Sequence, residues 1–168
     1  GIAQRQKIRI RYYGKLDELE LPRLEIKSKI GHVGKKEIIE LNKNELYENN
    51  FSLIQAFNSN PEKRNLLYIL FSIEPKVIVT YKRKYFLSSC DKYRFTLDSD
   101  ISFKKFNINS PKESLNYKLL YPFNKNILEL KYKREYEIDA SQILMNLPSR
   151  VSSFSKYLKA LYSIGWNT

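Results

Sequence analysis

The sequence predicts an α+β fold in which an antiparallel β sheet curls into a barrel, with helices packed outside it. Three observations point to this class. Several segments alternate apolar and charged residues with a period of two, which is typical of strands with one buried face. Two other stretches carry helical patterns with capping signals. The 168 residues are enough for one domain with a substantial core, and no internal repeat divides them.

The charge of the chain indicates an anionic partner. The 30 Lys and Arg residues exceed the 18 Asp and Glu residues, which gives a formal net charge of +12. This excess favours nucleic acid, a phosphate polymer or an acidic membrane surface, although codon bias in an AT-rich genome would also raise the lysine content. The single cysteine, Cys90, excludes an intrachain disulfide framework, and the single histidine, His32, has no neighbouring metal ligand. No apolar run is long enough to span a membrane.

The first half of the chain is predicted to hold three strands and a helix. The strands are residues 7–13, 24–30 and 35–41. The last two are joined by a turn between Gly31 and Gly34. Residues 42–50 fit a short helix or turn. Pro61 suits the first turn of the following helix, which Pro75 ends.

The second half is predicted to hold further strands and two closing helices. The strands are residues 77–86, 92–98, 117–122 and 127–136, and the first two form a hairpin that turns at residues 88–91. Residues 107–116 form a polar loop. The helices are residues 141–147, capped by Asp139, and residues 154–164, capped by Ser152 or Ser153. The predicted organisation is one domain over residues 1–168.

Four of the strands place charged side chains on one face and apolar side chains on the other. In an extended chain, residues two apart share a face. The polar sets are Lys7, Arg9 and Arg11; Glu25, Lys27 and Lys29; Arg94, Thr96 and Asp98; and Glu129, Lys131 and Lys133. Each strand alone fits an ordinary sheet with one solvated face. Together they would place like charges side by side, which destabilises a sheet unless a polyanion neutralises them, so we predict a phosphate-lined groove or channel.

The residue types on these faces suit phosphate chemistry. The planar fork of Arg holds two phosphate oxygens and keeps its charge when it is partly desolvated. Carboxylates among cations suit Mn²⁺ or Mg²⁺, which bridge to phosphate oxygens, and Glu129 is the best candidate ligand. Glu25 and Asp98 are explained equally well as ion-pair partners that keep neighbouring cations in position. Ser155 and Lys156 give a weaker signal: a hydroxyl, an ammonium group and free backbone N–H groups near a helix start.

Six short segments, taken in order, resemble the vacuolar transporter chaperone (VTC) domain. They are Arg9-Ile10-Arg11-Tyr12, Glu25-Ile26-Lys27, Tyr81-Lys82-Arg83, Tyr93-Arg94-Phe95-Thr96-Leu97-Asp98, Leu128-Glu129-Leu130-Lys131 and Phe154-Ser155-Lys156-Tyr157. Their order and approximate spacing agree with that family over most of the chain. The VTC domain belongs to the triphosphate tunnel superfamily, so the resemblance implies a closed antiparallel β barrel with helices outside. Its eukaryotic members are polyphosphate polymerases that transfer the terminal phosphate of ATP to a growing chain with a divalent metal.

The resemblance also implies roles for particular residues. Catalytic, phosphate-binding roles fall on Arg9, Arg11, Lys27, Arg83, Arg94 and Lys156. Tyr81 and Ser155 assist in binding phosphate, Lys131 adds a cation from the strand pattern, and Glu129 holds the Mn²⁺ or Mg²⁺ ion. Two features depart from the family. Ser153 stands where the family usually has Lys, and nothing before Gln4 supplies the lysine of an earlier tunnel strand. We therefore expect this chain to lack the first strand of the barrel, either because the chain is a fragment or because the strand is supplied elsewhere.

Three functions are compatible with these features. The first is ATP-dependent polyphosphate synthesis, and the second is hydrolysis or binding of such ligands without synthesis, because the fold alone does not decide. The third is nucleic-acid binding, which is disfavoured because Tyr12, Phe95 and Tyr132 fall on apolar strand faces. We expect ATP and polyphosphate as partners, a cytoplasmic location that includes the membrane surface, and membrane association only through other domains. The sequence does not indicate an oligomeric state.

Overall fold

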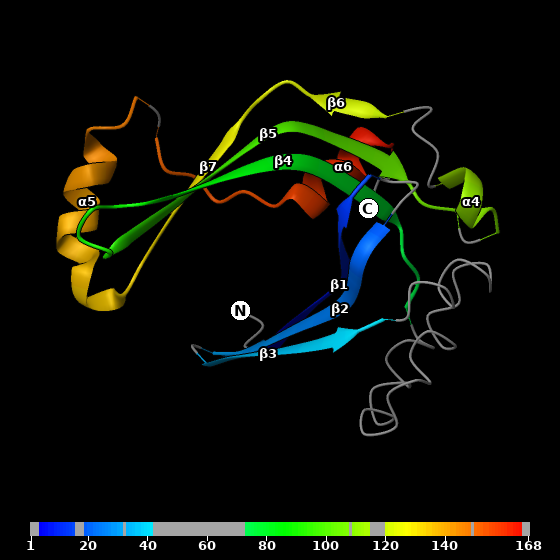
Figure 1. Cartoon of the computed structure of the whole chain (residues 1–168), viewed down its shortest axis with the longest axis horizontal. Helices are drawn as coiled ribbons and strands as arrows, with labels where there is room; N and C mark the ends of the chain where they lie inside the picture. Colours follow the sequence, from blue (N-terminus) through cyan, green and yellow to red (C-terminus); the bar gives the residue numbers. More distant parts are fainter. Residues whose placement is uncertain are drawn as a thin grey trace. The chain divides into compact units, whose positions relative to one another are not determined.

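The chain forms two antiparallel sheets in two compact units (Figure 1). The computed structural model describes residues 4–15, 19–31, 33–41, 73–107, 109–114, 120–148 and 150–165. Unit 1 comprises Gly1–Lys76 and Phe106–Lys118, and unit 2 comprises Val77–Lys105 and Leu119–Thr168. The predicted helix or turn at residues 42–50, the helix from Pro61 and His32 lie outside the described residues. The prediction of a single domain stays a prediction.

Unit 1 is built on a three-stranded sheet in the order β1-β2-β3. The strands are β1 (Gln4–Gly14), β2 (Leu19–Ile30) and β3 (Val33–Glu40), which confirms the three predicted strands. Gly31 follows β2 with a φ of 56°, a conformation that side chains disfavour, so the tight turn into β3 depends on this glycine. Leu24 and Ile39 face each other across β2 and β3 and, with Ile26, are buried in the core of the unit.

Unit 2 contains four strands with β5 at the centre. The strands are β4 (Val77–Leu87), β5 (Tyr93–Lys105), β6 (Tyr121–Phe123) and β7 (Ile127–Tyr132). β5 pairs with β4 along one edge and with β6 and β7 along the other. The predicted β4–β5 hairpin is confirmed. The late strand is shorter than predicted, because a 3-10 turn, η2 (Arg134–Tyr136), follows β7.

β5 runs well beyond its predicted end at Asp98 because a β-bulge interrupts its alternation. The register with β4 shifts between Thr80 and Lys82, and Asp100, on the opposite strand, has a φ of 51°. The extra residue moves the odd-numbered side chains of β5 onto the face that its even-numbered side chains occupy before the bulge. Asp98 and Ile101 therefore share one face, and the period-two pattern of the sequence stops at Asp98.

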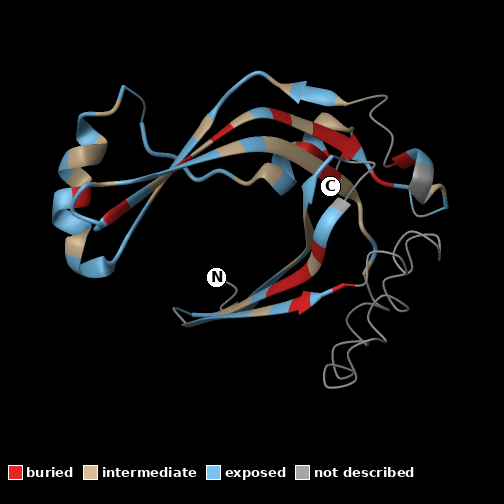
Figure 2. Ribbon diagram, in the orientation of Figure 1, coloured by how far each residue is buried: buried red, intermediate tan, exposed pale blue. Residues whose placement is uncertain are grey.

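Helix α6 (Lys156–Ser163) covers the apolar end of this face. Its Ala160 is fully buried against Ile101 and Phe103, within the buried stretch of β5 that Figure 2 shows in red. The helix begins after Ser155, whose Oγ accepts a hydrogen bond from the backbone N–H of Leu158 at 3.4 Å. The predicted caps, Ser152 and Ser153, are therefore wrong. α6 also lies on the face that carries Asp98, whereas the prediction placed helices on the apolar exterior.

The remaining helices are short. Helix α5 (Glu137–Met145) follows η2, and its N-cap is Tyr136, three residues before the predicted cap Asp139. The ring of Tyr136 packs edge-on against Tyr93 of β5, with 6.2 Å between the ring centroids. Helix α4 (Pro111–Ser114) occupies part of the predicted polar loop.

The α+β class with antiparallel strands is confirmed, and the barrel is not. Over the described ranges the strands form a three-stranded and a four-stranded sheet, and no closed barrel is found. A closed barrel requires pairing between strands that are distant in sequence, which no alternation within a strand can predict. No helix in the described part of the chain is long and apolar enough to cross a membrane.

Candidate functional site

Glu25 lies at the centre of a cluster of cations on the unit 1 sheet. Its side chain is 1% exposed. Arg9, directly opposite on β1, donates hydrogen bonds from Nε and Nη2 to Glu25 Oε2 at 2.8 and 2.6 Å. Oε1 lies 3.3 Å from Arg11 Nε, 3.2 Å from Lys36 Nζ and 4.0 Å from Arg23 Nε. We call Glu25 with Arg9, Arg11, Arg23 and Lys36 the Glu25 cluster; β1, β2 and β3 all contribute to it.

The cations keep Glu25 ionised despite its burial. Burial alone raises the pKa of this carboxyl, but the hydrogen bonds and charge of Arg9, together with Lys36 and Arg11, outweigh it and lower the pKa to about 2. One carboxylate therefore balances one of four cations, and the Glu25 cluster retains an excess of positive charge. Such an excess of positive charge on a folded sheet attracts anions.

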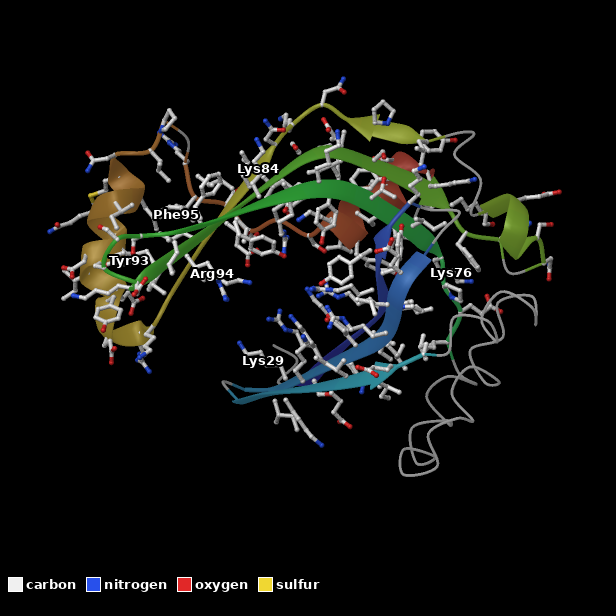
Figure 3. The ribbon with its side chains drawn as sticks, viewed as in Figure 1. Lys29, Lys76, Lys84, Tyr93, Arg94 and Phe95 are labelled. Atoms are coloured by element: carbon white, nitrogen blue, oxygen red, sulfur yellow. The ribbon has the colours of Figure 1, made fainter. Side chains whose placement is uncertain are left out.

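Further cations extend the same face beyond the cluster. The register sets Lys7 opposite Lys27, and Lys27 opposite Lys36. Towards the hairpin end of the sheet, Arg5 stands opposite Lys29, which is labelled in Figure 3. The sequence predicted that like charges would lie side by side on this sheet. Like charges directly opposite one another destabilise a sheet. A chain of phosphates running across this face would neutralise them.

Asp98 organises a second cluster, on the unit 2 sheet. Its side chain is 1% exposed and accepts hydrogen bonds from Arg83, from Nε to Oδ1 at 2.5 Å and from Nη2 to Oδ2 at 2.7 Å. Lys156 Nζ of α6 lies 2.5 Å from Oδ2. The ring of Tyr81 lies under both cations, with 5.1 Å from its centroid to Arg83 Cζ and 4.9 Å to Lys156 Nζ. We call Asp98, Arg83, Lys156 and Tyr81 the Asp98 cluster.

The charges of the Asp98 cluster stabilise one another. Burial alone raises the pKa of Asp98, but the hydrogen bonds from Arg83 and Lys156 outweigh it, so the pKa of this carboxyl is lowered. The hydrogen bonds to Asp98 in turn raise the pKa of Arg83. The bidentate pair fixes the guanidinium plane of Arg83, and the ion pair to Lys156 joins α6 to the central strand.

Three further predicted residues share this face. By the register, Glu129 of β7 lies opposite Thr96, and Lys131 lies opposite Arg94. Glu129 Oε1 lies 3.2 Å from Lys131 Nζ, and its Oε2 lies 3.5 Å from the hydroxyl of Thr96. Arg94 is exposed and makes no ion pair within the described residues, and Figure 3 shows its guanidinium directed away from the ribbon of β5. Arg94 is therefore a cation without an internal carboxylate.

Glu129 fits a metal ion that is coordinated mainly by the phosphate oxygens of a bound compound. Its carboxylate is about half exposed, and no group of three or more acidic, His or Cys side chains gathers as a metal site in the described part of the chain. Mg²⁺ commonly takes one or two protein carboxylates and completes its shell with phosphate oxygens and water. Glu129 beside Arg94 and Lys131 is compatible with that arrangement, provided that its ion pair with Lys131 opens.

The structure brings the predicted residues together in two groups. Arg9 and Arg11 share the Glu25 cluster, with Lys27 on the same sheet face; Arg83, Lys156 and Tyr81 share the Asp98 cluster, with Arg94, Glu129 and Lys131 on its face. Ser155 is used as the cap of α6. Glu25 and Asp98 have the geometry of ion-pair partners, the second of the two explanations that the sequence allowed.

Sequence reasoning missed Arg23 and Lys36 of the Glu25 cluster. Arg23 is two residues before Glu25, so extending the strand alternation by one step would have found it. Lys36 required the register of the β2–β3 hairpin, which alternation does not supply. Tyr85, discussed below, was missed as well, although it has the same parity as Tyr81 and Arg83.

These features define the class: an antiparallel α+β protein with two cation clusters, each arranged around a buried carboxylate on a strand face. The family model of the VTC domain matches residues 1–164 and so includes both units. The chain belongs to the VTC domain family, which is associated with polyphosphate metabolism. No curated protein sequence matches it.

Proposed function

We propose that the chain is a polyphosphate polymerase-like domain that transfers the terminal phosphate of ATP to a polyphosphate chain. The observation that carries the proposal is the Glu25 cluster, in which four cations share one carboxylate. The same face sets Lys7 opposite Lys27. A linear polyanion neutralises such a face along its length, whereas a single small anion neutralises one point. Membership of the VTC family supports polyphosphate as that polyanion.

The transfer requires positioning and charge stabilisation. The bond between the γ-phosphorus of ATP and its bridging oxygen breaks, a terminal oxygen of the acceptor chain bonds to that phosphorus, and ADP leaves. Because the acceptor oxygen is the nucleophile, no side chain has to form a covalent intermediate. Arg83, Arg94 and Lys156 would donate hydrogen bonds to the charge spread over the transferred group. A Mn²⁺ or Mg²⁺ ion at Glu129 would neutralise further phosphate charge when bound.

One observation favours a second candidate, binding or hydrolysis without synthesis. Glu129 is paired with Lys131, and the described ranges show no multidentate acidic site that would hold a metal before the ligand arrives. A domain with these clusters and no productive metal would retain polyphosphate without turnover, or would release free phosphate.

Incubation of the protein with ATP labelled at the γ-phosphate, in the presence of Mn²⁺, separates these functions. We expect labelled long-chain polyphosphate, resolved by gel electrophoresis. Labelled free phosphate as the main product would assign a hydrolase, and recovery of unaltered ATP on the protein would assign a binder.

A further inference from the structure

One exposed aromatic side chain lies among the charged residues of unit 2. Tyr85 of β4 is 62% exposed, and Leu87, two residues further, is 61% exposed. Both share the face of Arg83, because residues two apart on a strand point the same way. The sequence predicted that Tyr12, Phe95 and Tyr132 lie on apolar strand faces; Tyr85 lies instead on a charged face. A large apolar side chain that is exposed among cations indicates a ligand with both an apolar and an anionic part.

The cations flank this apolar strip on two sides. The register sets Leu87 opposite Arg94 and Tyr85 opposite Thr96. On the other side, Arg83 Cζ lies 5.9 Å from the centroid of the Tyr85 ring, and Asp98 holds that guanidinium in place. Residues two apart on a strand are separated by roughly 7 Å, so a planar group stacked on Tyr85 leaves its substituents within reach of both arginines.

We propose that Tyr85 and Leu87 form a platform for the base of a nucleoside triphosphate whose phosphates contact Arg83 and Arg94. The proposal rests on the proposed function and adds the feature that distinguishes its two ligands. A base has a π face that stacks on an aromatic ring, and inorganic polyphosphate has none. The platform therefore selects the nucleotide donor over the acceptor chain. Purines, with the larger π face, bind better than pyrimidines.

The test compares ATP with inorganic tripolyphosphate, both with Mg²⁺, by isothermal titration calorimetry on the full chain. Tyr85→Leu is expected to weaken ATP binding about tenfold and to leave tripolyphosphate binding unchanged, because the lost stacking involves the base alone. Tyr85→Phe keeps the ring and is expected to bind ATP like the wild type. Phe86→Leu is the matched control: Phe86 is 50% exposed on the opposite face of the same strand, and its loss is expected to change neither affinity.

Each contrary outcome has a distinct meaning. If Tyr85→Leu weakens both ligands equally, or neither, the platform is refuted. If Tyr85→Phe loses as much ATP affinity as Tyr85→Leu, the hydroxyl acts through Arg83 and the ring does not stack, which also refutes it. A wild-type protein that binds ATP through Tyr85 but makes no polyphosphate would remove the polymerase assignment and leave the platform in place. A wild type that binds neither ligand would overturn both proposals.

Discussion

Each cation cluster depends on one buried carboxylate. Glu25 and Asp98 are both 1% exposed, and each accepts two hydrogen bonds from an arginine on the neighbouring strand. Without its carboxylate, a cluster would consist of like charges held close together at the edge of a core. Breaking a buried ion pair by removing one partner is costly for this reason.

Replacement of Glu25 by Gln is expected to destabilise the fold. The four cations would then repel one another without compensation, and the free energy of unfolding should fall by about 2–4 kcal/mol, measured by urea denaturation. Glu37→Gln is the control, because Glu37 pairs with the exposed Lys35 and its loss should cost less than about 1 kcal/mol. Equal losses in the two variants would show that the Glu25 cluster does not stabilise the sheet.

Arg94→Ala is expected to separate binding from stability. Arg94 makes no ion pair in the described part of the chain, so its removal should leave the urea midpoint nearly unchanged. Binding of tripolyphosphate, measured by calorimetry, should weaken about tenfold or more, because a hydrogen bond to a charged group contributes about 1.5–3 kcal/mol. Lys84→Ala removes a charge from the opposite face of the same sheet and is expected to have little effect. A similar loss of affinity in both variants would indicate non-specific attraction.

Residue types, strand parity and the family resemblance predicted most members of the two clusters, and the partners across strands could not be predicted. Period-two alternation assigned Arg9, Arg11 and Lys27 to charged faces, because side-chain direction is fixed by the backbone. It could not show that Arg9 meets Glu25, or that Arg83 and Lys156 meet on Asp98. Those contacts depend on strand register and on the docking of α6, which are set by the packing of residues distant in sequence.

At the scale of elements, α6 both packs in the core of unit 2 and positions the Lys156 ammonium group beside Asp98. Ala160 packs on Ile101 and Phe103, while Lys156, in the first turn, reaches Asp98. The start of the helix therefore determines where the Lys156 ammonium group lies. Serines at positions 152, 153 and 155 all fit a cap by sequence preference, and the structure uses the third.

Ser155→Ala is expected to weaken the start of α6. Loss of the hydrogen bond to the Leu158 N–H should lower the free energy of unfolding by about 1 kcal/mol in urea denaturation. Ser152→Ala and Ser153→Ala are matched controls and should change it by less than about 0.5 kcal/mol. If either control is as destabilised as Ser155→Ala, the helix begins earlier than the structure shows.

At the scale of the whole molecule, the buried carboxylates make stability depend on pH. The pKa of Glu25 is lowered from 4.5 to about 2, and that of Asp98 is also lowered. A carboxyl whose pKa is lower in the folded state contributes stability above its unfolded pKa, and this contribution is lost as the pH falls towards the folded value.

Acid titration is therefore expected to show the stability that the ionised Glu25 contributes. As the pH falls from about 4.5 to 2, protonation of Glu25 should lower the free energy of unfolding by up to roughly 3 kcal/mol. The midpoints of urea denaturation, measured across that pH range, report this loss. In Glu25→Gln the free energy of unfolding should fall less over the same pH range, by the amount that Glu25 contributes. An unchanged slope in the variant would mean that Glu25 titrates alike in the folded and unfolded chains.

The fold class was predictable from the sequence, and whether the strands close into a barrel was not. Alternating strands and capped helices predicted α+β with antiparallel pairing, because these signals are local. Barrel closure depends on which distant strands pair, and the described ranges contain two sheets instead. The side of the sheet that α6 covers was predicted wrongly for a related reason: the bulge at Asp100 creates an apolar area on the charged face.

That bulge changes which positions of β5 point to a given face of the sheet. Up to Asp98 the even positions of the strand carry the polar and charged side chains of this face, and from Ile101 the odd positions on the same side build the hydrophobic core. One inserted residue lets one face of a single strand carry first charged side chains and then apolar core side chains. Any comparison of β5 with another strand has to count positions separately before and after Asp100, or it will exchange charged positions with core positions.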